Sequence, residues 1–253
     1  MQVLAHGTLV GYEHEVDIFV LLVIPVVSRE SAEKCIESIL SDNNACGVNK
    51  EDILIVDNTK EGLGDDYYGL RVYRDADNHN IGVARAWNIG AKEVVEKNID
   101  YLIVMSSSML FGVMKETTLL RQIATYKGFE IIEAEGHSWH LIAFKRDLFL
   151  EVGYFDENFY PAYFEDIDFS FRLRLLNQKR TWAIFWVNAI SQAVAKHSHL
   201  SLATPLLEYY KVKWGGDKGA ESYTLPFNDK PIDYFEDNRI EVLAKRYGLT
   251  EWW

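Results

Sequence analysis

Three short, continuous apolar runs most constrain the fold of this chain. They cover residues 18–24, 52–57 and 101–105, and they are rich in β-branched and aromatic side chains without polar alternation. Such strands are typical of a parallel sheet that is covered on both faces. Stretches with helical spacing of apolar residues lie between them. The order predicts an α/β fold, a Rossmann-type sandwich with a mainly parallel central sheet and helices on both faces.

The rest of the chain continues this alternation. Glycine, asparagine and aspartate clusters separate the expected elements. Further strands are expected at 70–73, 129–133, 139–144 and 181–190, and helices at 31–40, 82–98, 119–127, 146–152, 167–175, 203–213 and 238–246. We expect a single domain over residues 1–253, since the length suits one large α/β unit.

Composition and charge exclude several classes of protein. With 253 residues, 48% hydrophobic and 25% charged, the chain is globular rather than disordered. A net charge of −12 argues against a nucleic-acid partner, because phosphate backbones require clustered lysine and arginine. The apolar run at 18–27 contains Pro25 and is shorter than the roughly 20 residues that a membrane-spanning helix needs. Without a signal-peptide pattern or a disulfide framework, we expect a cytoplasmic protein with no transmembrane segment.

The strand ends predict where a ligand binds. In open α/β sheets, ligands lie beyond the carboxyl ends of the strands. The first, second and fourth strands are followed by Pro25 to Arg29, by Asp57 and Asn58, and by Ser106, Ser107 and Ser108. These loops are expected to meet at one crevice, where Asp57 accepts hydrogen bonds from a base or a ribose. The alternative role for Asp57 is that of a turn residue at a strand end.

Residues 153–174, GYFDENFYPAYFEDIDFSFRLR, combine aromatic rings with acids. Glu165, Asp166 and Asp168 fall where a helix begins, and acids are favoured there by the helix dipole. Asp168 and Arg172 have the spacing of an intrahelical ion pair. Glu165 and Asp166 are then expected on the turn before the helix, facing a pocket with an aromatic wall, where a partly dry site raises a carboxyl pKa toward the range of a general base. The alternative is that both acids only cap the helix.

These motifs resemble the family 2 glycosyltransferases, which have the GT-A fold. The pattern G-x-F-D-E-x-F followed by E-D-x-D-F-S-x-R resembles their acceptor side, and IPVVSR, IVDN and NHNIGVARAWNIG, in that order, resemble their donor half. The resemblance implies an inverting transferase of the hexosyltransferase class that moves a sugar from a nucleotide-sugar donor to the hydroxyl of a carbohydrate or glycan acceptor. It implies Asp166 as the catalytic base, beside Glu165.

The resemblance also divides the chain and assigns binding residues. It implies a nucleotide-sugar half at about 18–110, an acceptor half at about 111–200 and a C-terminal helical or lid extension at about 201–253. Residues implied to surround the nucleotide, or to lie near its ribose or diphosphate, are Pro25, Arg29, Asp57, Asn58, Asn80, Arg85 and Asn88.

The sequence departs from the family at the metal site. After the fourth strand the family has Asp-x-Asp, which holds Mg²⁺ or Mn²⁺, whereas this chain has Ser106, Ser107 and Ser108. Hard cations prefer carboxylate oxygens. Three interpretations are open: weak metal binding through Ser106 or Ser108, neutralisation of the diphosphate by cationic side chains, or an inactive enzyme. His197 and His199 resemble the family's late histidine and are either metal ligands or surface residues.

The segment 209–228 contains a cluster of cations in an otherwise acidic chain. Lys211, Lys213, Trp214 and Lys218 surround two adjacent glycines, whose exposed N–H groups suit an anion. We interpret Lys213, Trp214 and Lys218 as parts of a lid over the donor diphosphate. A plain surface loop is the alternative.

Two other functions compete with the transferase. A binding module that keeps nucleotide-sugar affinity but lacks transfer is consistent with the triple serine. A nucleotidyltransferase is less consistent, because residues 24–31, after the first strand, contain no glycine. The sequence leaves the sugar, the base, the acceptor and the oligomeric state open.

Overall fold

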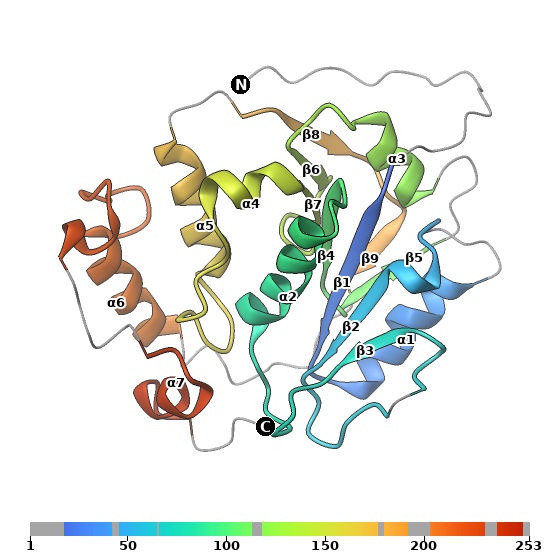
Figure 1. Ribbon diagram of the computed structural model, residues 1–253, viewed down its shortest axis with the longest axis horizontal. Coiled ribbons are helices and arrows are strands. Elements are labelled where there is room, and N and C mark those ends of the chain that lie inside the picture. The colour runs from blue at the N-terminus through green and yellow to red at the C-terminus, as the bar shows by residue number, and fades with distance from the viewer. Residues whose placement is uncertain are drawn as a thin grey trace.

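The computed structural model describes residues 18–41, 46–64, 66–112, 118–176, 180–191, 203–230 and 237–249 (Figure 1). The strands of the main sheet are β1 (Val20–Val26), β2 (Ile53–Asp57), β3 (Arg71–Tyr73), β4 (Tyr101–Met105), β6 (Ile131–Ala134), β7 (Leu141–Lys145) and β8 (Trp182–Phe185). The helices are α1 (Arg29–Leu40), α2 (Val83–Glu96), α3 (Leu119–Thr125), α4 (Arg146–Val152), α5 (Glu165–Leu175), α6 (Ala203–Trp214) and α7 (Ile240–Arg246). β5 (Met109–Phe111) and β9 (Ala189–Ser191) form a second, two-stranded sheet.

The main sheet has seven strands in the order β3-β2-β1-β4-β7-β6-β8. The pairs β2–β3, β1–β2, β1–β4 and β6–β8 are parallel. Only β7, among the described strands, runs against its two neighbours, β4 and β6. The predicted α/β fold with a mainly parallel sheet is therefore confirmed.

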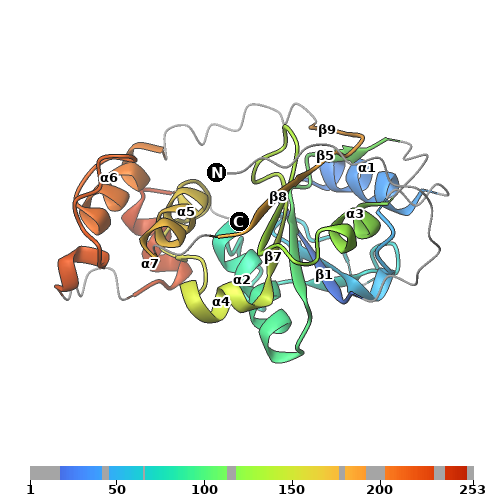
Figure 2. The same cartoon turned by 90° about the horizontal axis from the view of Figure 1, so that it is seen from above.

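Helices cover both faces of this sheet, as the apolar runs predicted. Leu21 and Val23 of β1 belong to the core that includes α2, α4 and α5, whereas Leu22 and Ile24 belong to the core that includes α1 and α3. Figure 2 shows these two groups of helices on opposite sides of the strands. A strand whose successive side chains are all buried has no room for polar alternation, and this is the origin of the continuous runs.

Pro25 lies inside β1 and pairs in register with Val56, whereas the sequence predicted that the strand stops before it. The strand tolerates proline here because of the side to which the Pro25 nitrogen points. The carbonyl of the next residue, Val26, accepts a hydrogen bond from Asn58 on the β2 side, so the Pro25 nitrogen faces the β4 side. Pairing of β1 with β4 ends at Val23. The missing N–H of proline therefore removes no hydrogen bond from the sheet.

The predicted strand at 181–190 is two strands in two different sheets. β8 forms one edge of the main sheet, and the chain then crosses to pair β9 with β5. At the crossing, the carbonyl of Asn188 accepts a hydrogen bond from Gly112. Trp182, Ile184 and Trp186 stay exposed on one side of this run, while Phe185 is buried on the other.

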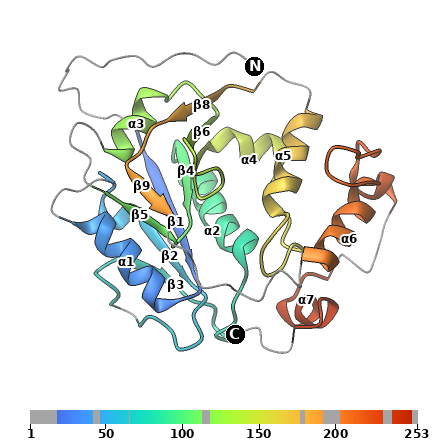
Figure 3. The same ribbon diagram turned by 180° about the vertical axis from the view of Figure 1, so that it is seen from behind.

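The last two helices lie on the far side of α5 from the sheet. α6 and α7 stand beside α5 and distant from β3 (Figures 1 and 3). Their apolar side chains, among them Leu206, Tyr210 and Leu243, belong to the same core as α2 and α5. Within the described residues, no helix combines the length and apolar character that crossing a bilayer requires.

Gly90 on α2 tests the packing of that helix on the sheet. A β-carbon at this position would lie 2.8 Å from Leu102 Cδ1 and still closer to Val23 Cγ2. In a helix interior, Gly→Ala is normally stabilising by about 1 kcal/mol. Here we expect Gly90→Ala to lower the free energy of unfolding by roughly 1–3 kcal/mol, because the added carbon overpacks the core. Urea denaturation measures the change.

Gly128→Ala is the matched control, since a β-carbon there meets no atom within 4 Å. Its effect is expected to stay within about 0.5 kcal/mol. A Gly90→Ala protein as stable as the parent would show that α2 does not pack as closely against β1 and β4 as described.

Candidate active site

Buried polar residues gather at the carboxyl edge of the parallel strands. They are Asp57, Asn58, Thr59, Asn80, Ser107 and Ser108. Asn58 links three elements there, because its N–H donates to the Val26 carbonyl and its Oδ1 accepts from Ile81 N at 2.9 Å. Its Nδ2 is buried and makes no hydrogen bond within the described part of the chain. Asn58 is thus the residue of this edge with an unused donor.

Asp57 is held by groups of the protein itself. Its carboxylate accepts hydrogen bonds from the amide and hydroxyl of Thr59, from Leu63 N and from Arg74, at 2.7 to 2.9 Å. Burial alone would raise the pKa of Asp57, but these hydrogen bonds outweigh it and lower the pKa below the ordinary value. The bond to Thr59 is the contact expected of a turn residue at a strand end, the alternative role of Asp57. Binding of a base or ribose by Asp57 stays a prediction.

Arg29 and Arg74 flank this edge. Arg29 begins α1 and donates to the Gly62 carbonyl at 2.7 Å, while its guanidinium stays largely exposed. Arg74 follows β3 and also donates to the Thr59 carbonyl. Sequence reasoning missed Arg74, since no motif includes it. The signal was its place directly after the edge strand, at the same end of the sheet.

The motif at 80–90 holds the acceptor-side loop in place. Asn88 brackets the Phe155 backbone: its Oδ1 accepts from Phe155 N at 2.8 Å, and its Nδ2 donates to Phe155 O at 2.9 Å. Arg85 donates to Glu157 at 2.9 Å and to the Asn238 carbonyl at 2.7 Å. Asn88 and Arg85 therefore have partners within the protein, and their contact with a ribose or diphosphate stays a prediction.

The start of α2 meets the same loop. Gly82 has a φ of 80°, and a β-carbon there would lie 2.9 Å from both the Pro161 carbonyl and the Tyr160 ring. Val83 N donates to that Pro161 carbonyl, and the Tyr160 hydroxyl donates to the Asn80 carbonyl. Only glycine combines this backbone conformation with so close an approach.

A strained turn at residues 163–164 precedes Glu165 and Asp166, the two acids predicted to be catalytic. Tyr163 and Phe164 have φ values of 85° and 71°, the left-handed region that non-glycine residues rarely adopt. Two such residues in a row cost about 1–3 kcal/mol each, which the surrounding contacts must offset. Glu165 and Asp166 follow as the first residues of α5, whereas the sequence predicted them on the turn before the helix. Asp168 pairs with Arg172 at 2.9 Å, which confirms the predicted ion pair.

Both acids are less acidic than usual. Burial, and next the charge of Asp166, raise the pKa of Glu165 to about 8. Oε2 of Glu165 is buried with no hydrogen-bond partner within the described residues. Burial also raises the pKa of Asp166, partly offset by backbone N–H groups and by the charge of Lys218. Of the two, Glu165 is the carboxyl that its pKa of about 8 favours in the protonated form at neutral pH.

Lys218 lies on a compact loop after α6. Gly215 has a φ of 72°, and a β-carbon on it or on Gly216 would collide with residues of the returning chain. The loop folds back on the helix, because Ser222 N and Tyr223 N both donate to the Trp214 carbonyl. Glycines here permit a tight return of the chain, whereas the sequence suggested a mobile lid. The loop carries the Lys218 charge to the Asp166 carboxylate.

Lys213 and Trp214 lie away from any open surface. Both side chains are buried at the end of α6, and both donate to Asp168, at 2.5 Å and 2.8 Å. The lysine cluster in the sequence does not reveal these acidic partners, and contact of Lys213 and Trp214 with a diphosphate stays a prediction.

The end of β4 presents only neutral donors and acceptors. Ser106 Oγ and Ser108 Oγ are hydrogen-bonded to each other at 2.8 Å, and Ser108 N donates to Ser106 Oγ. Such hydroxyls do not fit a divalent cation that needs carboxylate ligands. His197 and His199 lie outside the described residues.

One group of side chains in the described part of the chain does have the composition of a cation site. Asp75, Asp77 and His79 follow β3, and each offers a ligand atom within 4.8 Å of the others. Asp75 Oδ2 already accepts hydrogen bonds from the backbone N–H groups of Asp77 and His79. These bonds define a turn, which accounts for the cluster without an ion.

Two solved structures share this fold. TarS of S. aureus has a TM-score of 0.51 and 11% identity, over 77% of this chain and 40% of its own. A structure of GalNAc-T7 with UDP, GalNAc and Mn²⁺ has a TM-score of 0.52 and 13% identity, over 78% of this chain and 51% of its own. This chain therefore spans about half or less of the length of either protein. No protein-family model and no curated protein sequence matches it.

Both of these proteins are GT-A glycosyltransferases, and the chain has their fold. The helices, the sheet order and the acidic turn are thus set in a scaffold that nucleotide-sugar transferases use. The identity is too low for the likeness to extend to substrate or mechanism.

The protonated state of Glu165 has a measurable effect on stability. Its pKa is raised in the folded protein, so its contribution is fully present below the unfolded pKa, near 4.5, and is lost as the pH rises through about 8. We expect the melting temperature to fall over this window, by the equivalent of up to roughly 1.4 kcal/mol per pH unit. Glu165→Gln should flatten the fall.

Asp147→Asn, an exposed acid on α4, is the control and should leave the pH dependence unchanged. An equally steep fall in the Glu165→Gln protein would mean that this carboxyl is ionised at neutral pH.

Proposed function

We propose that the protein is a glycosyltransferase that transfers a sugar from a nucleotide-sugar donor to an acceptor hydroxyl with inversion at the anomeric carbon. The observation that carries the proposal is the pair Glu165 and Asp166, two carboxyls of raised pKa at the start of α5. A GT-A fold around that pair supports the choice of nucleotide sugar as the donor class.

Asp166 is the proposed general base. It accepts the proton of the acceptor hydroxyl as the acceptor oxygen forms a bond to the anomeric carbon. The bond from that carbon to the diphosphate oxygen breaks, and the nucleoside diphosphate leaves with the electron pair. Because burial raises the pKa of Asp166, its basicity is better matched to neutral pH than that of an exposed aspartate. Glu165 stays neutral, so that the charge of the pair is concentrated on Asp166.

The donor is proposed to lie along the carboxyl edge of β1, β2 and β4. Pro25, Arg29, Asp57, Asn58 and Asn80 belong to that edge, and Asn58 Nδ2 supplies a buried donor without a partner there. Lys218 is proposed to neutralise charge on the diphosphate from the opposite side. Mn²⁺ or Mg²⁺ stays a prediction, and no step above passes through a metal, because the hydroxyls of Ser106 and Ser108 do not fit one.

The base assignment predicts the behaviour of Asp166→Asn. We expect its rate of transfer to fall by about 10²–10⁴, since the amide cannot accept the proton. Affinity for the donor should stay within about twofold, because a general base acts on the acceptor. Calorimetry with a panel of nucleotide sugars, with and without Mn²⁺, identifies the donor, and product analysis measures transfer and the anomeric configuration.

Asp147→Asn serves as the control and should keep parental activity. Full transfer by Asp166→Asn with the fold intact would remove Asp166 from the mechanism. Binding of nucleotide sugars by the parent protein with neither hydrolysis nor transfer would replace the enzyme with a binding module.

Lys218→Gln tests the charge next to the base. Lys218 lowers the pKa of Asp166, so its loss lets that pKa rise further. Activity requires ionised Asp166, and the acid limb of the pH–rate profile is therefore expected to move to higher pH. The donor KM should also rise. Lys211→Gln is the control, because Lys211 pairs with Glu208 and Asp217 instead. An unmoved acid limb in Lys218→Gln would separate this lysine from Asp166.

A further inference from the structure

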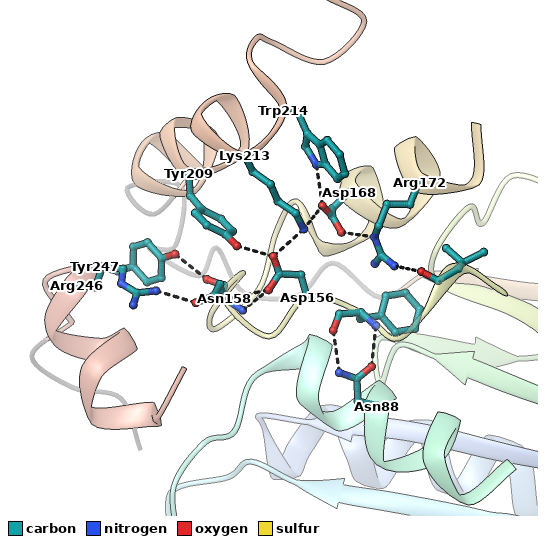
Figure 4. A network of polar contacts seen from close by, with 12 residues as sticks. Asn88, Asp156, Asn158, Asp168, Arg172, Tyr209, Lys213, Trp214, Arg246 and Tyr247 are labelled. Carbon is teal, nitrogen blue, oxygen red and sulfur yellow. Dashed lines mark hydrogen bonds and ion pairs between the residues drawn. The ribbon is translucent and has the colours of Figure 1, made fainter. Parts of the chain in front are cut away.

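A buried cluster of two acids and two cations lies between α5, α6 and the loop at 153–164 (Figure 4). Lys213 Nζ is 2.8 Å from Asp156 Oδ2 and 2.5 Å from Asp168 Oδ1, so one ammonium bridges two carboxylates. Arg172 holds the other oxygen of Asp168 at 2.9 Å. The Asp168 side chain is fully buried and that of Lys213 is 7% exposed. The mechanism proposed above uses none of these groups.

Each end of the cluster fixes a different part of the acidic turn. Asp156 belongs to the loop before α5, where its second oxygen accepts from the backbone and side chain of Asn158. Asp168 belongs to the first turn of α5, two residues after Asp166, and Asp168 N donates to the Phe164 carbonyl. Lys213 therefore ties the beginning of the loop to the residue that closes the strained turn at its end.

Neighbouring contacts reinforce the bridge from three sides. The Tyr209 hydroxyl donates to Asp156 at 2.6 Å, and Trp214 Nε1 donates to Asp168 at 2.8 Å. Arg172 also donates to the Val152 carbonyl, at the point where the loop leaves α4. Figure 4 shows these side chains converging on the two aspartates. Burial would raise the pKa of Asp156, but Lys213 and its other donors lower it below the ordinary value.

A buried ion pair is a weak source of net stability, because desolvation of the charges offsets much of their attraction. An apolar contact between α6 and α5 would hold the helices together as well. A lysine between two carboxylates has a further effect: its hydrogen bonds fix the positions of both carboxylates within the narrow range of hydrogen-bond distances. A general base needs such precise placement, since small displacements of a catalytic group reduce the rate strongly.

We propose that Lys213 is a positioning residue for Asp166, acting through its bridge between Asp156 and Asp168. The proposal rests on the proposed function of Asp166 for its kinetic consequence. The bridge holds the loop and the first turn of α5 in one arrangement, so that the Asp166 carboxylate faces the acceptor at a constant distance.

Lys213→Met tests the proposal, with Arg180→Met as the matched control. Arg180 also bridges two acids, Glu130 and Glu151, with its side chain 10% exposed, but at the β6–β8 edge. In Lys213→Met we expect kcat to fall about 10²-fold while the donor KM changes by less than about twofold. Arg180→Met should lose melting temperature and keep kcat.

Hydrogen exchange gives a readout that does not require activity. The amides of residues 155–168 are expected to exchange at least about tenfold faster in Lys213→Met and at the parental rate in Arg180→Met. If the parent protein transferred no sugar, the proposed function would fail. Faster exchange confined to this turn would then still support the bridge, and unchanged exchange would overturn it.

The double variant Asp156→Asn with Lys213→Met separates position from stability. It removes the carboxylate that Lys213→Met leaves unpaired, so the melting temperature should recover. The bridge is still missing, so kcat should stay low. Recovery of kcat together with the melting temperature would overturn the proposal, as would parental kcat in Lys213→Met or an equal loss of kcat in Arg180→Met.

Discussion

The hydrogen bonds between the Asn88 side chain and the backbone of Phe155 connect the two halves of this molecule. One amide side chain satisfies both backbone polar groups of the buried residue Phe155, at 2.8 Å and 2.9 Å. Asn88 in turn is fixed by α2, which lies close against β1 and β4 because Gly90 has no side chain. The position of the acidic turn therefore follows from the sheet through a short chain of contacts, each of which tolerates little displacement.

The electrostatics of the site are unusual for a chain with a net charge of −12. Five carboxyls, those of Asp156, Glu157, Glu165, Asp166 and Asp168, lie within one loop and one helical turn. Asp156, Glu157 and Asp168 are paired with cations inside the fold, and burial raises the pKa of Glu165 to about 8. The ion pairs and the raised pKa of Glu165 reduce the repulsion that such a cluster would otherwise produce.

Much of the scaffold could be predicted from the sequence, because local composition decides it. The run at 101–105 is β4 with the same limits, and α4 occupies 146–152 as expected, ended by Gly153 at a φ of 83°. Short elements escaped prediction. β5 has three residues and owes its existence to pairing with β9, a partner far along the chain.

The sequence indicates which residues could form the site, but it does not show which side chains contact one another. Glu165 and Asp166 stand out by type and by place at a helix start. Asp156 and Lys213 are 57 residues apart, and no local sequence pattern predicts their contact. The motif containing Asn88 lies in a chain whose GT-A fold is confirmed, but which neighbour its amide contacts depends on how a distant loop packs.

The bridge between Asp156 and Asp168 also decides where the molecule can be divided. A shortened polypeptide ending after β9 would retain both aspartates but lose the ammonium between them, leaving Arg172 paired with Asp168 and removing the ion pair of Asp156. It would have to take up a proton at Asp156 or open the loop to water, and either change disorders the turn before α5. Fusions and chimaeras built on this scaffold should therefore be joined downstream of Trp214.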